Sequence, residues 1–89
     1  MKMTLNELRA KYGDAIIQFH KMGYVTRYYE CRDMDAHTVN EICGLGIESE
    51  YGTDYCMIGS GSLENVIEAL NRKGHKVAVL DNNVAIAVH

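Results

Sequence analysis

Glycines and one Asp-Asn-Asn turn divide this chain into short segments that alternate between helical and strand-like patterns. The chain has no proline, so Gly and Asn must form its turns. Apolar residues spaced three and four apart predict helices, and runs of β-branched and aromatic residues predict strands. Helices are predicted over residues 5–12, from a cap at residue 33 or 35 to residue 43, and from residue 63 to a stop at residue 74. Strands are predicted over residues 14–22, 24–31, 45–51, 54–58, 76–80 and 84–88.

The order of these segments, α-β-β-α-β-β-α-β-β, predicts a fold of the α/β class with a mixed sheet (an α+β mixed sheet). A length of 89 residues predicts a single domain over residues 1–89. The runs 14–22 and 24–31 are expected to form a hairpin about Gly23, and the runs 76–80 and 84–88 a second hairpin.

Polar residues are expected to cap the three helices. Thr4 and Glu7 form a capping-box pattern, in which the Thr4 hydroxyl accepts from the Glu7 backbone N–H and Glu7 reaches back. Either Asp33 or Asp35 is expected to cap the second helix, and Ser62 the third. The loop that ends at Ser62 could hold an anion at a helix N-terminus, but it has no Walker pattern and fits an ordinary cap better.

Composition and charge exclude several classes of protein. Hydrophobic residues make up 47% and charged residues 24%, which is typical of a globular domain. Nine Lys and Arg against twelve Asp and Glu give a net charge of −3, opposite in sign to most non-specific DNA binders. The length excludes a complete ATPase, polymerase or Rossmann enzyme. No apolar run is long enough for a membrane span and the N-terminus has no signal-peptide core, so we expect a cytoplasmic location and no membrane partner.

The spacing of cysteines and histidines gives no recognisable metal or catalytic motif. Three widely spaced cysteines, expected to be reduced thiols, form no C-x-x-C pair: Cys31, Cys43 and Cys56. Four histidines are scattered along the chain: His20, His37, His75 and His89. Neither set predicts a zinc site, a Cys/His pair or a Ser/His/Asp triad. We therefore expect a protein that is not an enzyme and that has no metal or cofactor.

The predicted second strand carries the residues best suited to binding. Side chains alternate along a strand, so Tyr28 and Glu30 should point to the same face, ~7 Å apart. An aromatic ring can stack on a nucleobase, and a carboxylate can accept a hydrogen bond from a base edge. A purely structural interpretation is also open: the tyrosines of a half-exposed strand cover a helix, and its charges are solvated.

Six segments, in this order, resemble the N-terminal mismatch-recognition domain (domain I) of the MutS DNA mismatch-repair proteins. They are Tyr12–Gly23, Tyr28–Glu30, Asp35–Ala36, Gly44–Ile47, Met57–Gly59 and Leu63–Leu80. In the family the first is an apolar strand that ends in Arg-Met-Gly or a close variant, and the second is Phe-Tyr-Glu. The resemblance covers about residues 4–82, and it implies a MutS domain I-like fold.

The resemblance also implies roles for particular residues. In the family, the aromatic residue of Phe-x-Glu stacks on the mismatched base from the minor groove and the glutamate hydrogen-bonds the same base. Tyr28 would then be the wedge and Glu30 its partner, while phosphate contacts would come from nearby cations: Arg27, Lys21 and Arg32. The hairpin before this motif is about three residues longer here than in the family. Aligned without a gap, Val25 and Arg27 would fall at the Phe and Glu positions.

Two functions therefore stay open. One is a non-catalytic domain that binds mismatched double-stranded DNA, which calls for an exposed Tyr28 beside Glu30 and a positive patch around them. The alternative is a protein-interaction or regulatory module that reuses the fold without binding DNA. In that case Tyr28 should be packed in the core, and the apolar strand Val84–Val88 could pair at a sheet edge with a partner or in a homodimer.

Overall fold

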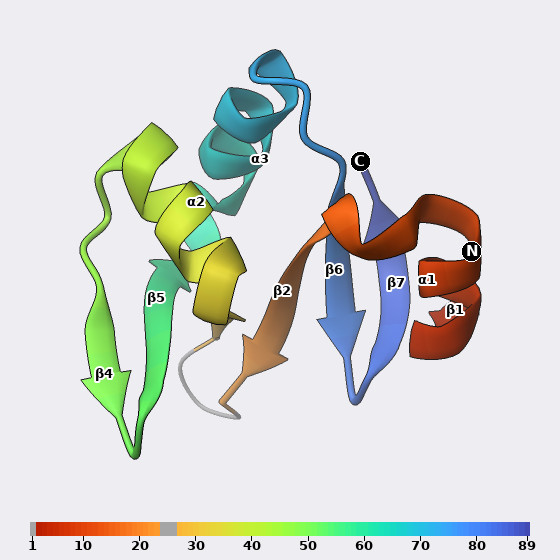
Figure 1. Cartoon of the computed structure of the whole chain (residues 1–89), viewed down its shortest axis with the longest axis horizontal. Coiled ribbons are helices and arrows are strands. Elements are labelled where there is room, and N and C mark those ends of the chain that lie inside the picture. The colour runs from red at the N-terminus through yellow and green to blue at the C-terminus, as the bar shows by residue number, and fades with distance from the viewer. Residues whose placement is uncertain (1, 24–26) are drawn as a thin grey trace.

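The computed structural model describes residues 2–23 and 27–89, in which three α-helices and seven strands alternate (Figure 1). Their bounds are β1 Met3–Thr4, α1 Leu5–Tyr12, β2 Ile17–Met22, β3 Tyr28–Arg32, α2 Asp33–Cys43, β4 Glu48–Glu50, β5 Thr53–Gly59, α3 Leu63–Arg72, β6 Val77–Asp81 and β7 Val84–Val88. The expected order of helices and strands is confirmed, with the two-residue strand β1 added before the first helix.

The strands form one sheet in the order β1-β7-β6-β2-β3-β5-β4. β2 and β6 are parallel, with Ile17 opposite Val77, and the other neighbouring pairs are antiparallel, so the expected mixed sheet is confirmed. The expectation that β7 is an edge strand is wrong where β7 begins. Met3 and Thr4 pair with Ala85 and Val84 there, and a strand of two residues is too short to leave a sequence pattern.

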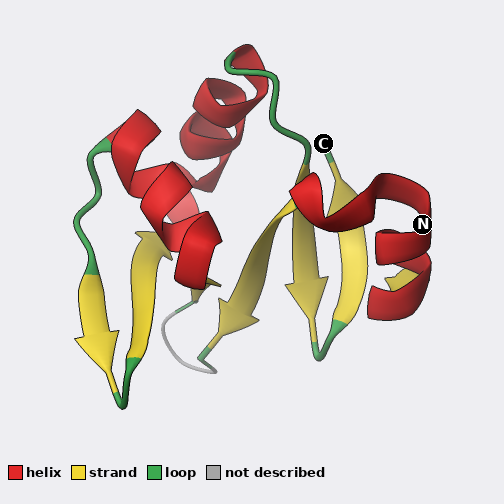
Figure 2. Cartoon of the chain, viewed as in Figure 1, coloured by secondary structure: helices red, strands yellow, loops and turns green. Residues whose placement is uncertain are grey.

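Helices cover the two sides of the sheet unequally. α2 packs on β3 and β5, and α3 packs on α2 and β6 (Figure 2). Their apolar stripes meet a buried layer of strand residues that includes Ile17, Phe19, Cys31, Cys56 and Ile58. We call this side of the sheet the closed face.

α1 packs on the opposite side of the sheet, but only at the β6–β7 end. Leu8 of α1 is fully buried there against Ala78, Leu80 and Ala85. Because side chains alternate along a strand, Val77 and Val79 of β6 belong to the closed face while Ala78 and Leu80 meet α1. The same side over β2, β3, β5 and β4 lacks such a layer among the described residues, and we call it the open face.

The ends of the helices confirm one predicted cap and correct two. The Glu7 backbone N–H donates to the Thr4 hydroxyl at 3.2 Å, and that hydroxyl donates to the Glu7 carboxylate at 3.1 Å. At α2 neither Asp33 nor Asp35 is the cap, because the helix begins at Asp33 after an extended Arg32 that makes no side-chain cap. Asp35 instead accepts a hydrogen bond from the Gln18 backbone N–H at 3.0 Å, which ties the helix to β2. The Ser62 side chain does not cap α3. A 3-10 turn leads directly into the helix, so Ser62 has helical dihedral angles, whereas a capping residue needs an extended backbone.

Two predicted strands are shorter than expected. Residues 13–15 form a 3-10 turn, so β2 begins at Ile17, and β4 covers only Glu48–Glu50 of the predicted run 45–51. Part of the predicted strand 24–31 lies outside the described residues, and β3 begins at Tyr28. β2 and β3 nevertheless pair as the expected antiparallel hairpin, with Met22 opposite Tyr28.

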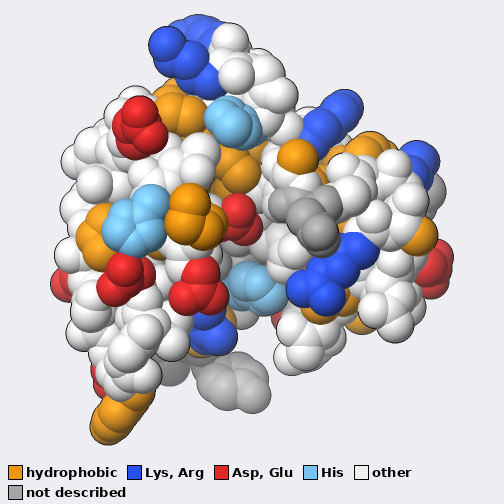
Figure 3. Space-filling model, viewed as in Figure 1, with side chains coloured by type: hydrophobic (Ala, Val, Ile, Leu, Met, Phe, Trp, Pro, Cys, Tyr) orange, Lys and Arg blue, Asp and Glu red, His pale blue; other side chains and the backbone are white. Residues whose placement is uncertain are grey.

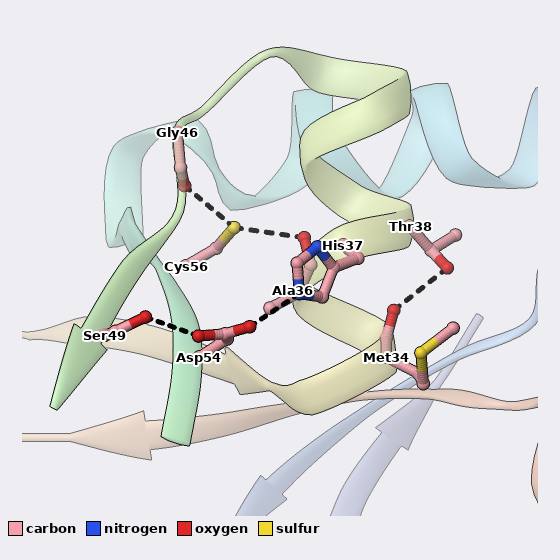
Figure 4. Close-up of polar contacts among 8 residues, drawn as sticks. All are labelled: Met34, Ala36, His37, Thr38, Gly46, Ser49, Asp54 and Cys56. Carbon is pink, nitrogen blue, oxygen red and sulfur yellow. Dashed lines mark hydrogen bonds and ion pairs between the residues drawn. The ribbon is translucent and has the colours of Figure 1, made fainter. Parts of the chain in front are cut away.

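Two hydrogen-bond clusters tie α2 to the β4–β5 hairpin (Figure 4). The single S–H of the buried Cys56 is shared between the Ala36 and Gly46 backbone carbonyls, whose oxygens lie 3.2 and 3.0 Å from the sulfur. Burial raises the pKa of this thiol, which keeps it protonated as a donor. Cys31 lies opposite Cys56 in the sheet, and burial raises its pKa to about 12. Both thiols are free, as expected from their spacing.

Candidate functional site

The open face is built mainly by alternate residues of β3. Tyr28, Glu30 and Arg32 point to it, whereas Tyr29 and Cys31 pack in the core of the closed face. This confirms that Tyr28 and Glu30 share a face, as the period of two along a strand predicts. Gly59 lies opposite Tyr28 on β5, and a Cβ added there would meet nothing within 4 Å, so space remains beside the ring.

The strands around β3 close these residues into a shallow groove of about 420 Å³. Eight residues line it: Met22, Tyr28, Glu30, Arg32, Glu50, Tyr51, Thr53 and Tyr55. Three of them are tyrosines, and they come from β3, β5 and the β4–β5 turn. The groove therefore offers aromatic rings together with carboxylate and hydroxyl groups, which can stack on a planar ligand and accept hydrogen bonds from it.

Glu30 already has a partner in the groove. Its Oε1 lies 2.6 Å from Arg32 Nε, and only 13% of the Glu30 side chain is exposed against 50% for Arg32. The ion pair holds the carboxylate in place. A ligand that bonds to Glu30 must therefore use a free lone pair of the carboxylate or displace the guanidinium.

The other two candidate cations do not take part in this ion pair, although Lys21 lines a small hollow that Arg32 also lines. Lys21 pairs with Tyr29 in the β2–β3 ladder and makes an ion pair with Asp81 of β6, with Nζ and Oδ2 3.6 Å apart. Its side chain therefore points to the closed face. Arg27 is exposed just before β3. Of the five candidate site residues, the structure brings Tyr28, Glu30 and Arg32 together.

The surroundings of Tyr28 are more acidic than the DNA interpretation calls for. Partial desolvation, followed by the charges of Glu48, Glu50 and Glu30, raises the pKa of Tyr55. On the side of the molecule where α2 lies in front, Figure 3 likewise shows Lys and Arg side chains at separate places, including the region around α1 and the end of α3, with acidic side chains near α2. Tyr28 thus has the expected flanking position beside Glu30, but the lining of the groove combines one cation with two carboxylates.

A second hollow adjoins the open face between α1 and the start of α2. Arg9, His20 and Arg32 line it, together with the carboxylates of Asp33 and Asp35. Burial lowers the pKa of His20, and the nearby Arg32 charge lowers it further, so this histidine is neutral at pH 7. Arg32 lines both the groove and this hollow, so the hollow adds one further guanidinium, that of Arg9.

The fold also brings together a serine, an aspartate and a histidine whose spacing in the sequence gave no signal. Asp54 Oδ2 lies 2.7 Å from His37 Nε2, and the Ser49 hydroxyl donates to Asp54 Oδ1 (Figure 4). The aspartate stands between the other two, so the imidazole does not contact the hydroxyl that it would have to activate. The hydrogen bonds from Ser49 and His37 lower the pKa of Asp54, and the cluster acts as a tie between α2 and the β4–β5 hairpin.

Two further observations apply to residues 2–23 and 27–89. Within these ranges no three His, Cys, Asp or Glu side chains lie close enough together to hold a metal ion. None of the three helices has the length and apolar character required to cross a membrane.

A comparison of the sequence with protein-family models gives a match. The family model described as MutS domain I matches residues 1–88, nearly the whole chain. A search among curated proteins gives no match. The resemblance carried by the six short segments is confirmed by the family match.

Proposed function

The chain belongs to the MutS domain I family, and from that premise we propose that it recognises mismatched DNA without catalysing a reaction. In MutS, domain I is the non-catalytic part that recognises mismatches. The observation that carries the proposal is the placing of Tyr28 and Glu30 on the open face, in one groove beside the β2–β3 hairpin.

Tyr28 is the wedge in this proposal. A mispaired base is poorly stacked, so unstacking it and bending the duplex there costs less than at a matched pair. An aromatic ring inserted from the minor groove reads that difference in deformability. Tyr28 is half-buried, with Met22 and Gly59 as its neighbours across the strands, so the sheet supports its ring while leaving an edge accessible. Its hydroxyl needs a hydrogen-bond partner in the complex.

Glu30 is the group that hydrogen-bonds the displaced base. Its ion pair with Arg32 supports this role, because the guanidinium reduces the repulsion between a carboxylate and the phosphates of DNA. Arg32 is half-exposed, and it can turn toward a phosphate when the base takes its place on Glu30.

Phosphate contacts in this proposal come from Arg32 and the exposed Arg27 on either side of the wedge. Lys21 contributes only if it leaves Asp81. Few cations and a net charge of −3 predict weak binding with a shallow dependence on salt.

Fluorescence anisotropy of labelled duplexes tests the proposal. The wild-type domain should bind a single-mismatch duplex more tightly than the matched duplex at low salt, and Tyr28→Ala should abolish the difference. Equal binding to both duplexes that disappears in moderate salt would reduce the interaction to non-specific phosphate contact and contradict the proposal.

One observation favours the second candidate, a protein-interaction or regulatory module. The carboxylates Glu30, Glu48 and Glu50 give the β3–β5–β4 side an acidic character that suits a basic partner better than phosphates. A homodimer through β7 is restricted by β1, which occupies the edge beside Val84 and Ala85. No binding to either duplex at low salt would favour this candidate, and sedimentation at high concentration would show whether the partner is a second copy.

The three free thiols fit a reducing compartment, and we propose a cytoplasmic location on that ground. A fluorescent fusion observed in the source cells would test it.

A further inference from the structure

His20 is a titratable neighbour of Glu30 that the site described above does not use. The two residues are partners in the β2–β3 ladder, and residues directly opposite in an antiparallel pair have Cβ atoms about 4.5–5.5 Å apart. Ile17 and Phe19, which alternate with His20 along β2, pack in the core of the closed face, so His20 points to the open face as Glu30 does. The half-buried imidazole therefore lies beside the Glu30 carboxylate.

In the free domain Arg32 is the ion-pair partner of Glu30, with Nε and Oε1 2.6 Å apart. The guanidinium also lines both hollows that His20 lines, so its charge faces the imidazole. Burial lowers the pKa of His20 below its ordinary value of 6.5, the Arg32 charge lowers it further, and the Glu30 charge raises it. Departure of Arg32 would therefore favour a proton on His20.

The other charged groups around His20 are already offset by opposite charges. They come from α1, α2 and β2: Arg9, Asp33, Asp35 and Lys21. The two aspartates line the same hollow as Arg9, and the Lys21 ammonium pairs with Asp81. The lining from β6 and the β6–β7 turn is uncharged: Leu80, Asn82 and Asn83. The ion pair between Glu30 and Arg32 is therefore the charged contact beside His20 that DNA would rearrange.

We propose that His20 is a positioning residue for Glu30: when Arg32 turns to a phosphate, His20 takes up a proton from solvent and replaces the guanidinium as the partner of the carboxylate. The imidazolium donates to one carboxylate oxygen, and the other oxygen remains for the base. The inference rests on the proposed function, in which Arg32 leaves Glu30 and a base bonds to it. It adds a residue and a pH dependence that this function alone does not include.

A protonated His20 offsets a cost that the departure of Arg32 creates. The Glu30 side chain is only 13% exposed, so its charge would be poorly hydrated and unpaired once the guanidinium has turned away. A cation on the neighbouring strand restores the pair without a large movement, because His20 already lies opposite Glu30. His20 then binds more protons in the complex than in the free domain, so a lower pH favours the complex.

Fluorescence anisotropy at pH 6 and pH 8 tests the inference with a duplex that contains a dG·dT mismatch, whose bases do not titrate between these values. The preference of the wild type for this duplex over the matched one should be about threefold or more larger at pH 6, and one linked proton limits the change to about tenfold per pH unit. The ratio of the two affinities cancels the general gain in positive charge at lower pH. His20→Gln keeps a hydrogen-bond donor beside Glu30 but takes up no proton, so its preference should be the same at both pH values.

His89→Gln provides the matched control. His89 is exposed and lines a hollow beside α3, which covers the closed face, so this variant should keep the pH dependence of the wild type.

NMR of the histidine ring protons follows the proton itself and does not depend on the folding of a variant. In the wild type the pKa of His20 should lie below 6.5 in the free domain and above 6.5 in the complex with the mismatched duplex. Arg32→Gln imitates the departure of the guanidinium and should raise the pKa of His20 without DNA.

The outcomes separate this inference from the proposed function. A mismatch preference that Tyr28→Ala abolishes, but that is equal at pH 6 and pH 8, would refute the role of His20 and leave the proposed function standing. A pH dependence that persists in His20→Gln, or a His20 pKa that does not rise on binding, would also refute this role. If the wild type does not distinguish matched from mismatched duplexes at either pH, the proposed function fails, and the inference fails with it.

Discussion

The closed and open faces of β2, β3 and β5 are made by alternate residues of the same strands, yet their chemistry differs throughout. On the closed face Phe19, Cys31 and Ile58 are almost completely buried beneath α2 and α3. On the open face Tyr28, Glu30 and Arg32 surround a groove and stay partly exposed. The closed face stabilises the fold through its packed core. The open face carries side chains that this packing does not require. A change of residue should therefore affect stability or binding according to the face on which it falls.

The largest effect is expected from the closed face. Phe19→Ala removes a ring with no exposed surface and should cost about 3–5 kcal/mol of unfolding free energy. A domain of this size is stable by only ~5–10 kcal/mol, so the variant should be close to unfolded at 37 °C. Urea denaturation measures the loss. Met22→Ala, three residues along on the open face, should cost much less, and an equal loss would contradict the division between the faces.

Adjacent tyrosines give the sharpest comparison. Tyr28→Ala should weaken binding to a mismatched duplex by about 1–3 kcal/mol through the lost stacking, with little change in stability. Tyr29→Ala should do the reverse, because Tyr29 packs against the closed-face core. Anisotropy and thermal melting of both variants measure the two effects. If both lose stability equally and neither changes binding, the open face is not the DNA-binding surface.

A smaller effect is expected from the ion pair in the groove. Glu30→Gln removes the charge paired with Arg32 and should lower the unfolding free energy by no more than about 1 kcal/mol, since the guanidinium is half-exposed. The preference for a mismatch should fall, because the amide no longer presents two acceptor oxygens to the base. Denaturation and anisotropy measure the two effects. A gain in mismatch preference would show instead that the carboxylate opposes DNA binding.

The smallest effect concerns pH and the hydrogen bonds that tie α2 to the β4–β5 hairpin on the closed face. Hydrogen bonds from Ser49 and His37 hold the pKa of Asp54 below its ordinary value of 3.8. The charged carboxylate therefore stabilises the fold above pH 3.8, and this contribution disappears as the pH falls through the lowered pKa. Asp54→Asn should be less stable than wild type at neutral pH and should lose less stability on acidification.

Melting curves across the acid range check this prediction about Asp54. Glu41→Gln, which changes an exposed carboxylate on α2, provides the control and should follow the wild type. Parallel curves for wild type and Asp54→Asn would remove any role for the hydrogen-bond cluster in acid stability.

The sequence predicted the elements of the fold where a repeated spacing or a turn signal was present. The apolar stripe of α3 and the Asn82-Asn83 turn are local patterns, and both lie where they were expected. The two-residue strand β1 was missed, because pairing with β7 decides its existence and no local pattern does. Asp35 was misassigned as a cap for the same reason, since its partner Gln18 lies 17 positions away.

The candidate site could be predicted only in part. Because side chains alternate along a strand, the sequence positions of Tyr28 and Glu30 were enough to predict that the two side chains share one face. The pairing of Glu30 with Arg32 follows the same alternation, and the period of two could have indicated it. The approach of Tyr51 to the groove depends on β4 and β5 pairing beside β3, which the sequence does not encode locally.

The central claim, that the open face receives mismatched DNA, is tested most directly by NMR of the domain labelled with 13C at its methionine methyl groups. Met22 lines the groove beside Tyr28, whereas Met3 is buried under α1. Titration with a mismatched duplex should shift and broaden the Met22 methyl signal and leave the Met3 signal unchanged, while the matched duplex has a weaker effect at the same concentration. A Met22 signal that does not move while the duplex is shown to be bound would place the DNA elsewhere and contradict the account.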